Sequence, residues 1–582
     1  MTTPPPSHHR LLTRLFLRQF LENDLLSPDG DRSQMLAVTG ATVISLTMFI
    51  SMFMSSQYAM AILMPAHAAV LTLNDKFFYV SLAMLVTAIT AAAQWEALAL
   101  DQRDTAILQP LPVRPRTLRL AKLSAVAILG GAVALGVNVF PTWVFPWMVA
   151  FAVPQMTTSQ LFSMMAVHAA ITVPAAVFGF LAVIALRETA SVLLGPKWFT
   201  RVSPLLQTVT LVALGIALLL LPMSSTRIGQ RGLAGWRLEL PPTAFVGAYE
   251  VATGGFLADL PRRRMTAIQA KRDQTYAAMY AERQPLFSPL ARRAQILLAG
   301  IAALVALMTL VNARRLPAAA VVSPGRRGRS RLIGIGAVLF PRNGSARAGF
   351  AFAVATMWRN KTHRLTLAAA AAIGFAAAVV ALSRVDLSEG GLSIRLLVIQ
   401  PLLYGSLLVA FRHALRVPAE LRANWAIQLA WRGRVRAFAS GAQAAALVTL
   451  AVPALVLVMP VVAAATGVSV AISHALLGVL GAAIMLEALM LMYDGVPFAC
   501  SYMPGDNMRV LAPIYGAAFL IGAIMFARLE FAILSGTFTV QGVTGLIVLL
   551  LSLRVASSRR RRVARVDFDE TPVTFQQLGL HT

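Results

Sequence analysis

Residues 78–140 decide the fold, and they read FYVSLAMLVTAITAAAQWEAL, then ALDQRDTAILQPLPVRPRTLRLAK, then LSAVAILGGAVALGVNVF. The first and last of these segments are apolar, and each has about the 20 residues that an α-helix needs to cross the hydrocarbon core of a bilayer. The middle segment, by contrast, carries charges of both signs and several prolines. The stretch therefore predicts two membrane-spanning helices that are joined by a short charged loop.

The composition of the whole chain agrees with this interpretation. Of its 582 residues, 58% are hydrophobic and only 13% are charged, and the mean hydropathy is +0.70. Soluble domains carry about 25% charged residues, and disordered chains have low hydrophobicity, so both classes are excluded. The single cysteine, Cys500, allows no internal disulfide and no multi-thiolate metal site. We therefore expect an all-α, polytopic membrane protein.

Twelve apolar runs are long enough to be membrane-spanning helices. The first six are Met35–Met54, Phe78–Leu98, Leu123–Phe140, Leu161–Leu186, Leu205–Leu221 and Ala294–Val311. The second six are Leu365–Leu382, Leu396–Phe411, Phe438–Val458, His474–Tyr493, Val510–Ala527 and Val540–Leu553.

The loop charges predict the orientation of these helices. The chain carries a formal net charge of +27, which in a soluble protein would suggest nucleic acid as a partner. With the N-terminus inside, however, the seven cytoplasmic segments hold 36 Lys and Arg residues, whereas the short outer loops hold four. This asymmetry follows the positive-inside rule, from which the long outer connection 222–293 is exempt because of its length. Both termini are therefore expected in the cytoplasm, and no nucleic-acid partner is expected.

The order of the segments predicts two halves built on one plan. Each half has an interfacial apolar stretch, two spans, a charged cytoplasmic loop and four more spans, which makes the repeat parallel. At an offset of 319 residues, Asp101 aligns with Glu420 and Arg103 aligns with Arg422. The expected organisation is an N-terminal segment 1–34, a first half 35–311, a basic linker 312–364, a second half 365–553 and a basic tail 554–582.

The cytoplasmic basic segments are expected to contact lipid. Leu11–Phe20 has the pattern of an amphipathic helix, with Leu12, Leu15, Phe16 and Phe20 on one side and Arg14 and Arg18 on the other. The linker is rich in arginine, so we expect it to be attracted to the anionic inner leaflet. A plain basic tail that only sets orientation is the alternative for the N-terminal segment.

The sequence gives no sign of catalysis or of a bound cofactor. No Gly-Lys dipeptide occurs, so the GxxxxGK[ST] loop that binds nucleotide phosphates is absent. There is no HExxH motif, and His168 and His474 have no acidic or cysteine neighbours at the spacing of metal ligands. We expect no metal, no cofactor and no enzyme activity in this chain.

Acidic residues within spans are costly and are commonly functional. Glu487 in the tenth span is the clearest case, whereas Glu96 and Glu530 lie near span ends from which water is within reach. Glu487 either binds a proton or a cationic substrate, or it pairs with a buried donor of another helix.

The first charged loop resembles the coupling segment of one transporter family. It has acidic residues, an Arg-Asp pair, a Leu-Pro-Val sequence and basic residues before the next span; its candidate residues are Asp101, Arg103, Asp104, Pro110, Pro112, Arg114 and Arg116. This pattern, with a six-span half and an N-terminal interfacial helix, is similar to permeases of the type 2 exporter class of ABC transporters. The charges alone would also suit an ordinary cytoplasmic loop.

The resemblance implies a bacterial inner-membrane permease that works, as an exporter, with a separate cytoplasmic ATPase. In that family the loop after the second span contacts the ATPase subunit. In the second half the corresponding residues are Glu420, Arg422 and Asn424, although Ala430-Trp431-Arg432 replaces the Leu-Pro-Val sequence.

Two other functional classes suit the same pattern. A secondary, proton-coupled transporter can also have two parallel six-span halves, and Glu487 would then carry the proton. A non-transporting membrane scaffold or signalling protein would use the outer connection 222–293 as its working part. That connection either gates an exit or meets a periplasmic partner, or it is a solvated hairpin.

Overall fold

The computed structural model describes residues 8–21, 64–98, 114–231, 238–261, 265–319, 331–383, 385, 391–419, 435–491, 493, 496–499 and 508–563. These residues form helices and no strand, which confirms the all-α prediction. The chain divides into two compact units, Met1–Ser323 (unit 1) and Pro324–Thr582 (unit 2). The division falls within the segment 312–364 that we expected to be a linker.

Within the described residues, ten helical segments are long and apolar enough to cross a membrane. In unit 1 they belong to α3 (Pro65–Ala93), α5 (Pro115–Ala152), α6 (Thr158–Arg231, two segments) and α9 (Ala267–Ala319). In unit 2 they are α12 (Lys361–Leu382), α13 (Ile394–Leu397) with α14 (Ile399–Ala414), α16 (Val435–Ala446) with η4 (Leu447–Ala451) and α17 (Val452–Thr466), α18 (Val468–Leu491), and α20 (Thr539–Val563). Of the other two predicted spans, Val510–Ala527 lies within α19 (Met508–Leu534), and Met35–Met54 lies outside the described residues.

The remaining helices are too short to cross a membrane. They are α1 (His8–Leu21), α7 (Pro241–Thr253), α8 (Phe256–Asp259), α10 (Arg331–Leu339) and α11 (Gly344–Arg359).

The fourth and fifth spans are joined through a sharp bend in α6. Gly195 adopts φ 68° and ψ 168°, which a residue without a side chain reaches at little cost, and Pro196 follows it. The proline has no N–H to donate to the preceding turn, so helical hydrogen bonding is interrupted there. The two apolar segments Thr158–Pro196 and Trp198–Pro222 are therefore separate spans.

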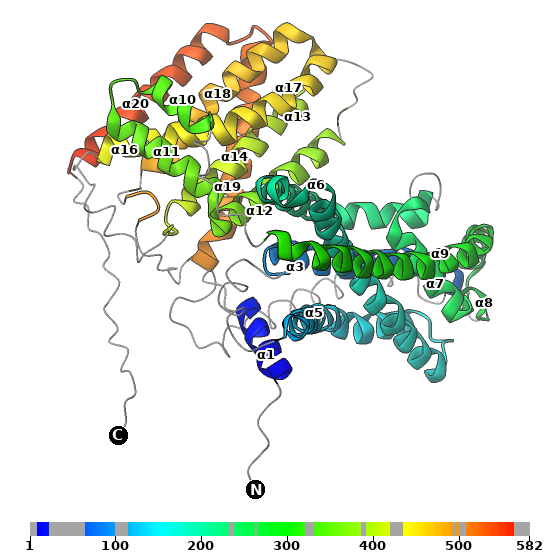
Figure 1. The fold of residues 1–582 in the computed structure, drawn as a ribbon. Helices are drawn as coiled ribbons and strands as arrows, with labels where there is room; N and C mark the ends of the chain where they lie inside the picture. The colour runs from blue at the N-terminus through cyan, green and yellow to red at the C-terminus, as the bar shows by residue number, and fades with distance from the viewer. Residues whose placement is uncertain are drawn as a thin grey trace. The chain divides into compact units, whose positions relative to one another are not determined.

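The same span is central in each unit. In unit 1, α3 contacts α5, α6, α7, α8 and α9 (Figure 1). In its most apolar 18-residue window, 72% of the residues are buried. In unit 2, α14 contacts α12, α17, α18 and α19, and 67% of the residues in the most apolar 18-residue window of Ile394–Ala414 are buried. In the corresponding windows of the last spans, in α9 and α20, only 6% and 11% of the residues are buried.

A helix that precedes the spans packs on the third span in each unit. In unit 1, α1 contacts α5, with Leu12 and Phe16 buried and Lys122 Nζ lying 4.4 Å from the ring centroid of Phe16. Leu12 and Phe16 of the expected apolar side therefore pack against protein. Leu15, which we expected on the same side, is instead exposed, as is Leu11. In unit 2, α11 contacts α16 in the same way.

Glycines allow the close approach of α11 and α16. A Cβ atom added to Gly349 would lie 2.0 Å from the carbonyl oxygen of Phe438, and one added to Gly441 would lie 2.0 Å from that of Ala346. Small residues at such a contact let two helix backbones approach each other, which is how helices associate within a membrane.

The helix α9 is much longer than the sixth span that we predicted. It has 53 residues, or about 80 Å, whereas a hydrocarbon core is about 30 Å thick. It begins at Ala267, so its first part belongs to the predicted outer connection 222–293. Asp273 on this part accepts hydrogen bonds from the backbone N–H groups of Ala66 and His67, which are among the free donors at the start of α3. The segment after Ala267 is therefore part of unit 1 and not a solvated hairpin.

Because α11 and α16 leave no room for a methyl group, Gly441→Ala is expected to lower the melting temperature of the purified chain. The overpacking cost is about 1–3 kcal/mol. Gly522→Ala on α19 is the matched control, since nothing lies within 4 Å of a Cβ atom there. Thermal unfolding in detergent measures both, and an equal effect of the two variants would contradict this packing.

Candidate functional site

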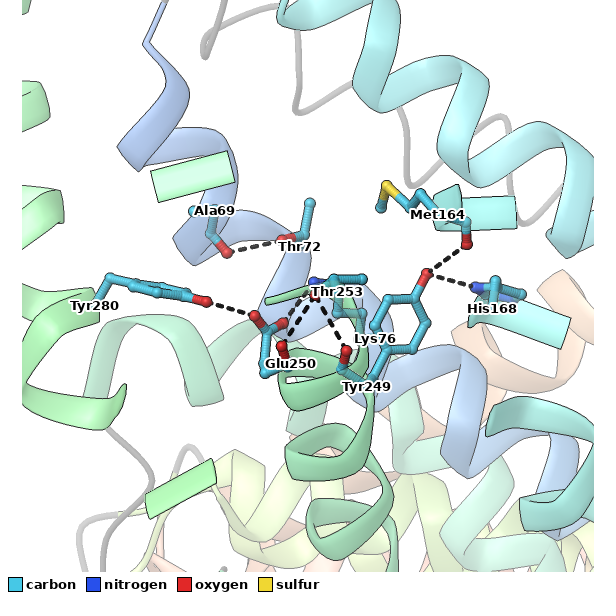
Figure 2. Close-up of polar contacts among 9 residues, drawn as sticks. All are labelled: Ala69, Thr72, Lys76, Met164, His168, Tyr249, Glu250, Thr253 and Tyr280. Carbon is cyan, nitrogen blue, oxygen red and sulfur yellow. Dashed lines mark hydrogen bonds and ion pairs between the residues drawn. The ribbon is translucent and has the colours of Figure 1, made fainter. Parts of the chain in front are cut away.

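A group of buried polar side chains joins α3 to α7 and α9 in unit 1 (Figure 2). The Nζ atom of Lys76 on α3 lies 2.5 Å from Oε1 of Glu250 on α7, and both side chains are only 2% exposed. Tyr280 on α9 donates its hydroxyl hydrogen to Oε2 of the same carboxylate at 2.5 Å. Both carboxylate oxygens therefore have partners, as a charge removed from water requires.

The ends of α7 and its contact with α9 explain how Glu250 reaches this position. The helix starts with Pro241 at its first turn and ends at Gly254, which is left-handed with φ 64°. Both residues are common at these helix positions. A Cβ atom added to Gly247 would lie 2.3 Å from Cβ of Leu290, so α7 lies very close to α9. Glu250, three residues later and on the same side of α7, can then reach Tyr280.

Tyr249 continues the group toward α6. Its hydroxyl oxygen lies 3.4 Å from both the carbonyl oxygen of Met164 and Nδ1 of His168, and its ring centroid lies 4.7 Å from Nζ of Lys76 (Figure 2). Burial, with a smaller effect of the nearby Glu250 charge, raises the pKa of the Tyr249 phenol well above its usual value. The hydroxyl therefore keeps its proton and can donate it in a hydrogen bond.

The space beside the pair is small. Thr72, Lys76, Glu250 and Tyr280 are among the residues that line a cavity of about 10 Å³, close to the least that one water molecule requires. This cavity can hold a water molecule, but it is too small for a transported molecule. The Lys76–Glu250 pair has no net charge and forms a fixed connection between α3 and α7.

The opposite end of α3 also has polar contacts. Nε of Arg187 on α6 donates to the carbonyl oxygen of Trp95 at 2.8 Å, and Arg187 pairs with Glu188. In unit 2, Nε of Arg412 on α14 donates to the carbonyl oxygen of Leu489 on α18, also at 2.8 Å. In each unit an arginine therefore links the second span to the fourth at the ends that we expect to face the cytoplasm.

The structure places only part of the predicted coupling loop. Arg114 and Arg116 lie at the start of α5 and are exposed. The other predicted residues of this loop (Asp101, Arg103, Asp104, Pro110 and Pro112) and those of the second loop (Glu420, Arg422 and Asn424) lie outside the described residues. The two exposed arginines are therefore the part of the predicted contact that can be located.

Glu487 lies half-buried on α18 and has donors from two other helices. Its Oε2 atom accepts hydrogen bonds from Nε2 of Gln443 on α16 at 3.3 Å and from Oγ of Ser557 on α20 at 3.0 Å. This arrangement matches the alternative in which Glu487 pairs with buried donors of neighbouring helices.

Three polar residues have roles that the sequence analysis missed. The sequence placed Lys76 in an outer loop, but the residue lies within α3. It placed Glu250 in the long outer connection, and the structure shows this residue buried on α7. Glu530 was expected near water but is 1% exposed and lies 2.6 Å from Nδ1 of His474. The sequence carries only a weak signal for these roles. Each charged residue lies at the edge of an apolar run, and its partner lies far away in the sequence.

Metal binding has no support among the described residues, where no group of three or more His, Cys, Asp or Glu side chains could hold an ion. No protein-family model, curated protein or solved structure matches this chain. What the sequence and structure establish together is a polytopic helical membrane protein.

Removing one member of the buried pair is expected to destabilise unit 1. Lys76→Met leaves the Glu250 carboxylate without its cation, which costs about 3–5 kcal/mol for a buried pair. The double variant Lys76→Met/Glu250→Gln removes both charges and should recover much of that loss. Thermal unfolding of the wild type, the two single variants and the double variant measures the interaction between the two side chains. Lys271→Met, at an exposed lysine, is the control. Additive losses in the double variant would show that the two side chains do not interact.

Proposed function

We propose that the chain is the membrane-spanning permease of an ATP-driven exporter of the ABC type. The observation that supports this most is the repeated arrangement of the two units. In each, a central second span (α3 or α14) precedes the charged loop, and the span after the loop (α5 or α16) carries a packed helix, α1 or α11. A force applied to either loop would therefore act on a buried helix and on its supported neighbour together.

The cytoplasmic partner in this proposal is a separate ATPase subunit. Arg114 and Arg116 present exposed positive charge at the start of α5, and the acidic residues Asp101 and Asp104 precede them in the sequence of the loop. ATP hydrolysis takes place on the partner, and its closure moves the loops. The second loop, through Glu420, Arg422 and Asn424, makes the second contact.

The membrane in this proposal is the bacterial inner membrane, with both termini in the cytoplasm. Arg10 and Arg14 are exposed on α1 next to the exposed Leu11 and Leu15. Apolar side chains beside cations suit the boundary of an anionic leaflet, where each cation near the surface contributes about 1 kcal/mol.

On the outer side, α7 and the first part of α9 are held against α3 by Glu250, Tyr280 and Asp273. This connection is fixed to unit 1 and still exposes polar residues such as Lys271 and Arg292. It provides a surface for a periplasmic partner in this proposal.

Charge reversal in the first loop tests the proposal. Asp101→Arg/Asp104→Arg and, separately, Arg114→Glu/Arg116→Glu are expected to reduce the amount of ATPase subunit that copurifies with the chain by at least about tenfold, which corresponds to 1.4 kcal/mol. The amount of chain inserted in the membrane should stay the same.

Lys271→Glu/Arg292→Glu is the matched control, because both cations are exposed in unit 1 but lie on the expected outer side. Unchanged copurification in the loop variants, with normal insertion, would remove the coupling role from this loop.

A further inference from the structure

A second buried ionisable pair lies in unit 2, away from both coupling loops. His474 on α18 and Glu530 on α19 are joined by a contact of 2.6 Å between Nδ1 and Oε1, and each side chain is 1% exposed. Both lie toward the expected outer ends of their helices, since α18 begins at Val468 and α19 ends at Leu534.

The face of α18 that carries His474 is shaped for polar neighbours. Gly478 and Gly481 follow His474 on this face at helical spacing. A Cβ atom at Gly478 would lie 1.9 Å from Nε2 of Gln400, and one at Gly481 would lie 2.7 Å from the hydroxyl oxygen of Tyr404. The two glycines therefore leave space for two polar side chains of α14, and Gln400 donates from Nε2 to the carbonyl oxygen of His474 at 3.0 Å.

Three buried polar atoms of this group have no hydrogen-bond partner among the described residues. They are Nε2 of His474, Oε2 of Glu530 and Oε1 of Gln400. Buried polar atoms are normally paired, because an unpaired one costs about 1–3 kcal/mol. The Lys76–Glu250 pair differs, since both oxygens of that carboxylate have partners. The His474–Glu530 pair therefore keeps hydrogen-bonding capacity that its own fold does not use.

The other ionisable groups around the pair are few. Tyr404 on α14 is the titratable side chain next to it, and α17 carries no ionisable residue. Arg395 on α13 and Arg528 on α19 are exposed, α20 has its first charged residue at Arg554, and Glu487 lies 13 residues further along α18. We find no neighbouring charge in the described residues that is placed to fix the state of the pair.

An exposed turn follows Glu530 closely along the chain. The residue is one helical turn, about 6 Å, before the end of α19. The exposed turn that follows contains Ser535, Gly536 and Thr537, and the two hydroxyl oxygens lie 2.7 Å apart. A local opening of this one turn would connect the carboxyl group to solvent.

We propose that the His474–Glu530 pair is a site of reversible proton binding that exchanges with the expected outer side of the membrane. The pair has a net charge of −1 without the proton and of zero with it, and the hydrogen bond between Nδ1 and Oε1 exists in both states. A proton needs no cavity, and it can arrive at Nε2 of His474 or Oε2 of Glu530, which have no hydrogen-bond partner within the described part of the chain. The chain would then respond to outer pH through unit 2, whichever energy source drives transport.

Infrared difference spectroscopy of the purified full chain between pH 5 and pH 9 tests this. The wild type should show a reversible change in carboxyl and imidazole bands that is lost in His474→Gln/Glu530→Gln. Glu487→Gln is the matched control, because it removes a half-buried carboxyl of the same unit that has neutral donors. It should keep the change.

The proposal is wrong if the double variant and the wild type give the same difference spectrum. Should the double variant fail to fold, Glu530→Gln alone gives the decision. Loss of its carboxyl band supports proton binding by the pair, and an unchanged spectrum overturns it. These outcomes do not depend on an ATPase partner, so they are separate from the test of the coupling loop.

Discussion

The burial of one helix at the centre of each unit is the constraint on which the rest of the structure depends. α3 and α14 are surrounded by other helices, whereas few residues in the apolar windows of α9 and α20 are buried. Lipid is as apolar as a leucine side chain, so helices in a membrane associate through close packing and polar contacts. The glycines at the contact between α11 and α16 and the arginines that bind carbonyl groups of neighbouring spans supply both kinds of contact. A central helix held in this way can pass movement from the charged loop that follows it into its unit.

Charges buried in such a unit have to be neutralised within it, and the two units do this differently. In unit 1, Lys76 and Tyr280 satisfy both oxygens of Glu250, so α3, α7 and α9 are fixed to each other. In unit 2, His474 and Glu530 are joined through one atom of each side chain, and the described residues offer no hydrogen-bond partner to Nε2 of His474 or Oε2 of Glu530. The first group is complete and suits a permanent connection, whereas the second is incomplete and suits exchange. The two halves thus share a plan for their helices but not for their buried polar groups.

Much of this architecture follows from the sequence, because the length of an apolar run is a direct consequence of bilayer thickness. The runs predicted ten of the observed spans, and Pro196 after Gly195 accounts for the bend between the fourth and fifth. The sequence did not reveal that α9 begins at Ala267, since polar residues outside the bilayer carry no hydrophobic signal for a helix. Nor did it reveal the partners of Lys76 or Glu530. Those pairs join residues 174 and 56 positions apart, and only tertiary packing brings them together.

The central claim is that the chain forms two coupled halves of one ATP-driven permease. Mild-detergent purification of the tagged full chain from its native membrane, with quantitative mass spectrometry of what accompanies it, tests this claim most directly. We expect a cytoplasmic ATPase at two copies per chain, one for each charged loop. If no ATPase accompanies a chain that is folded and monodisperse, the account is contradicted, and a secondary transporter becomes the better description.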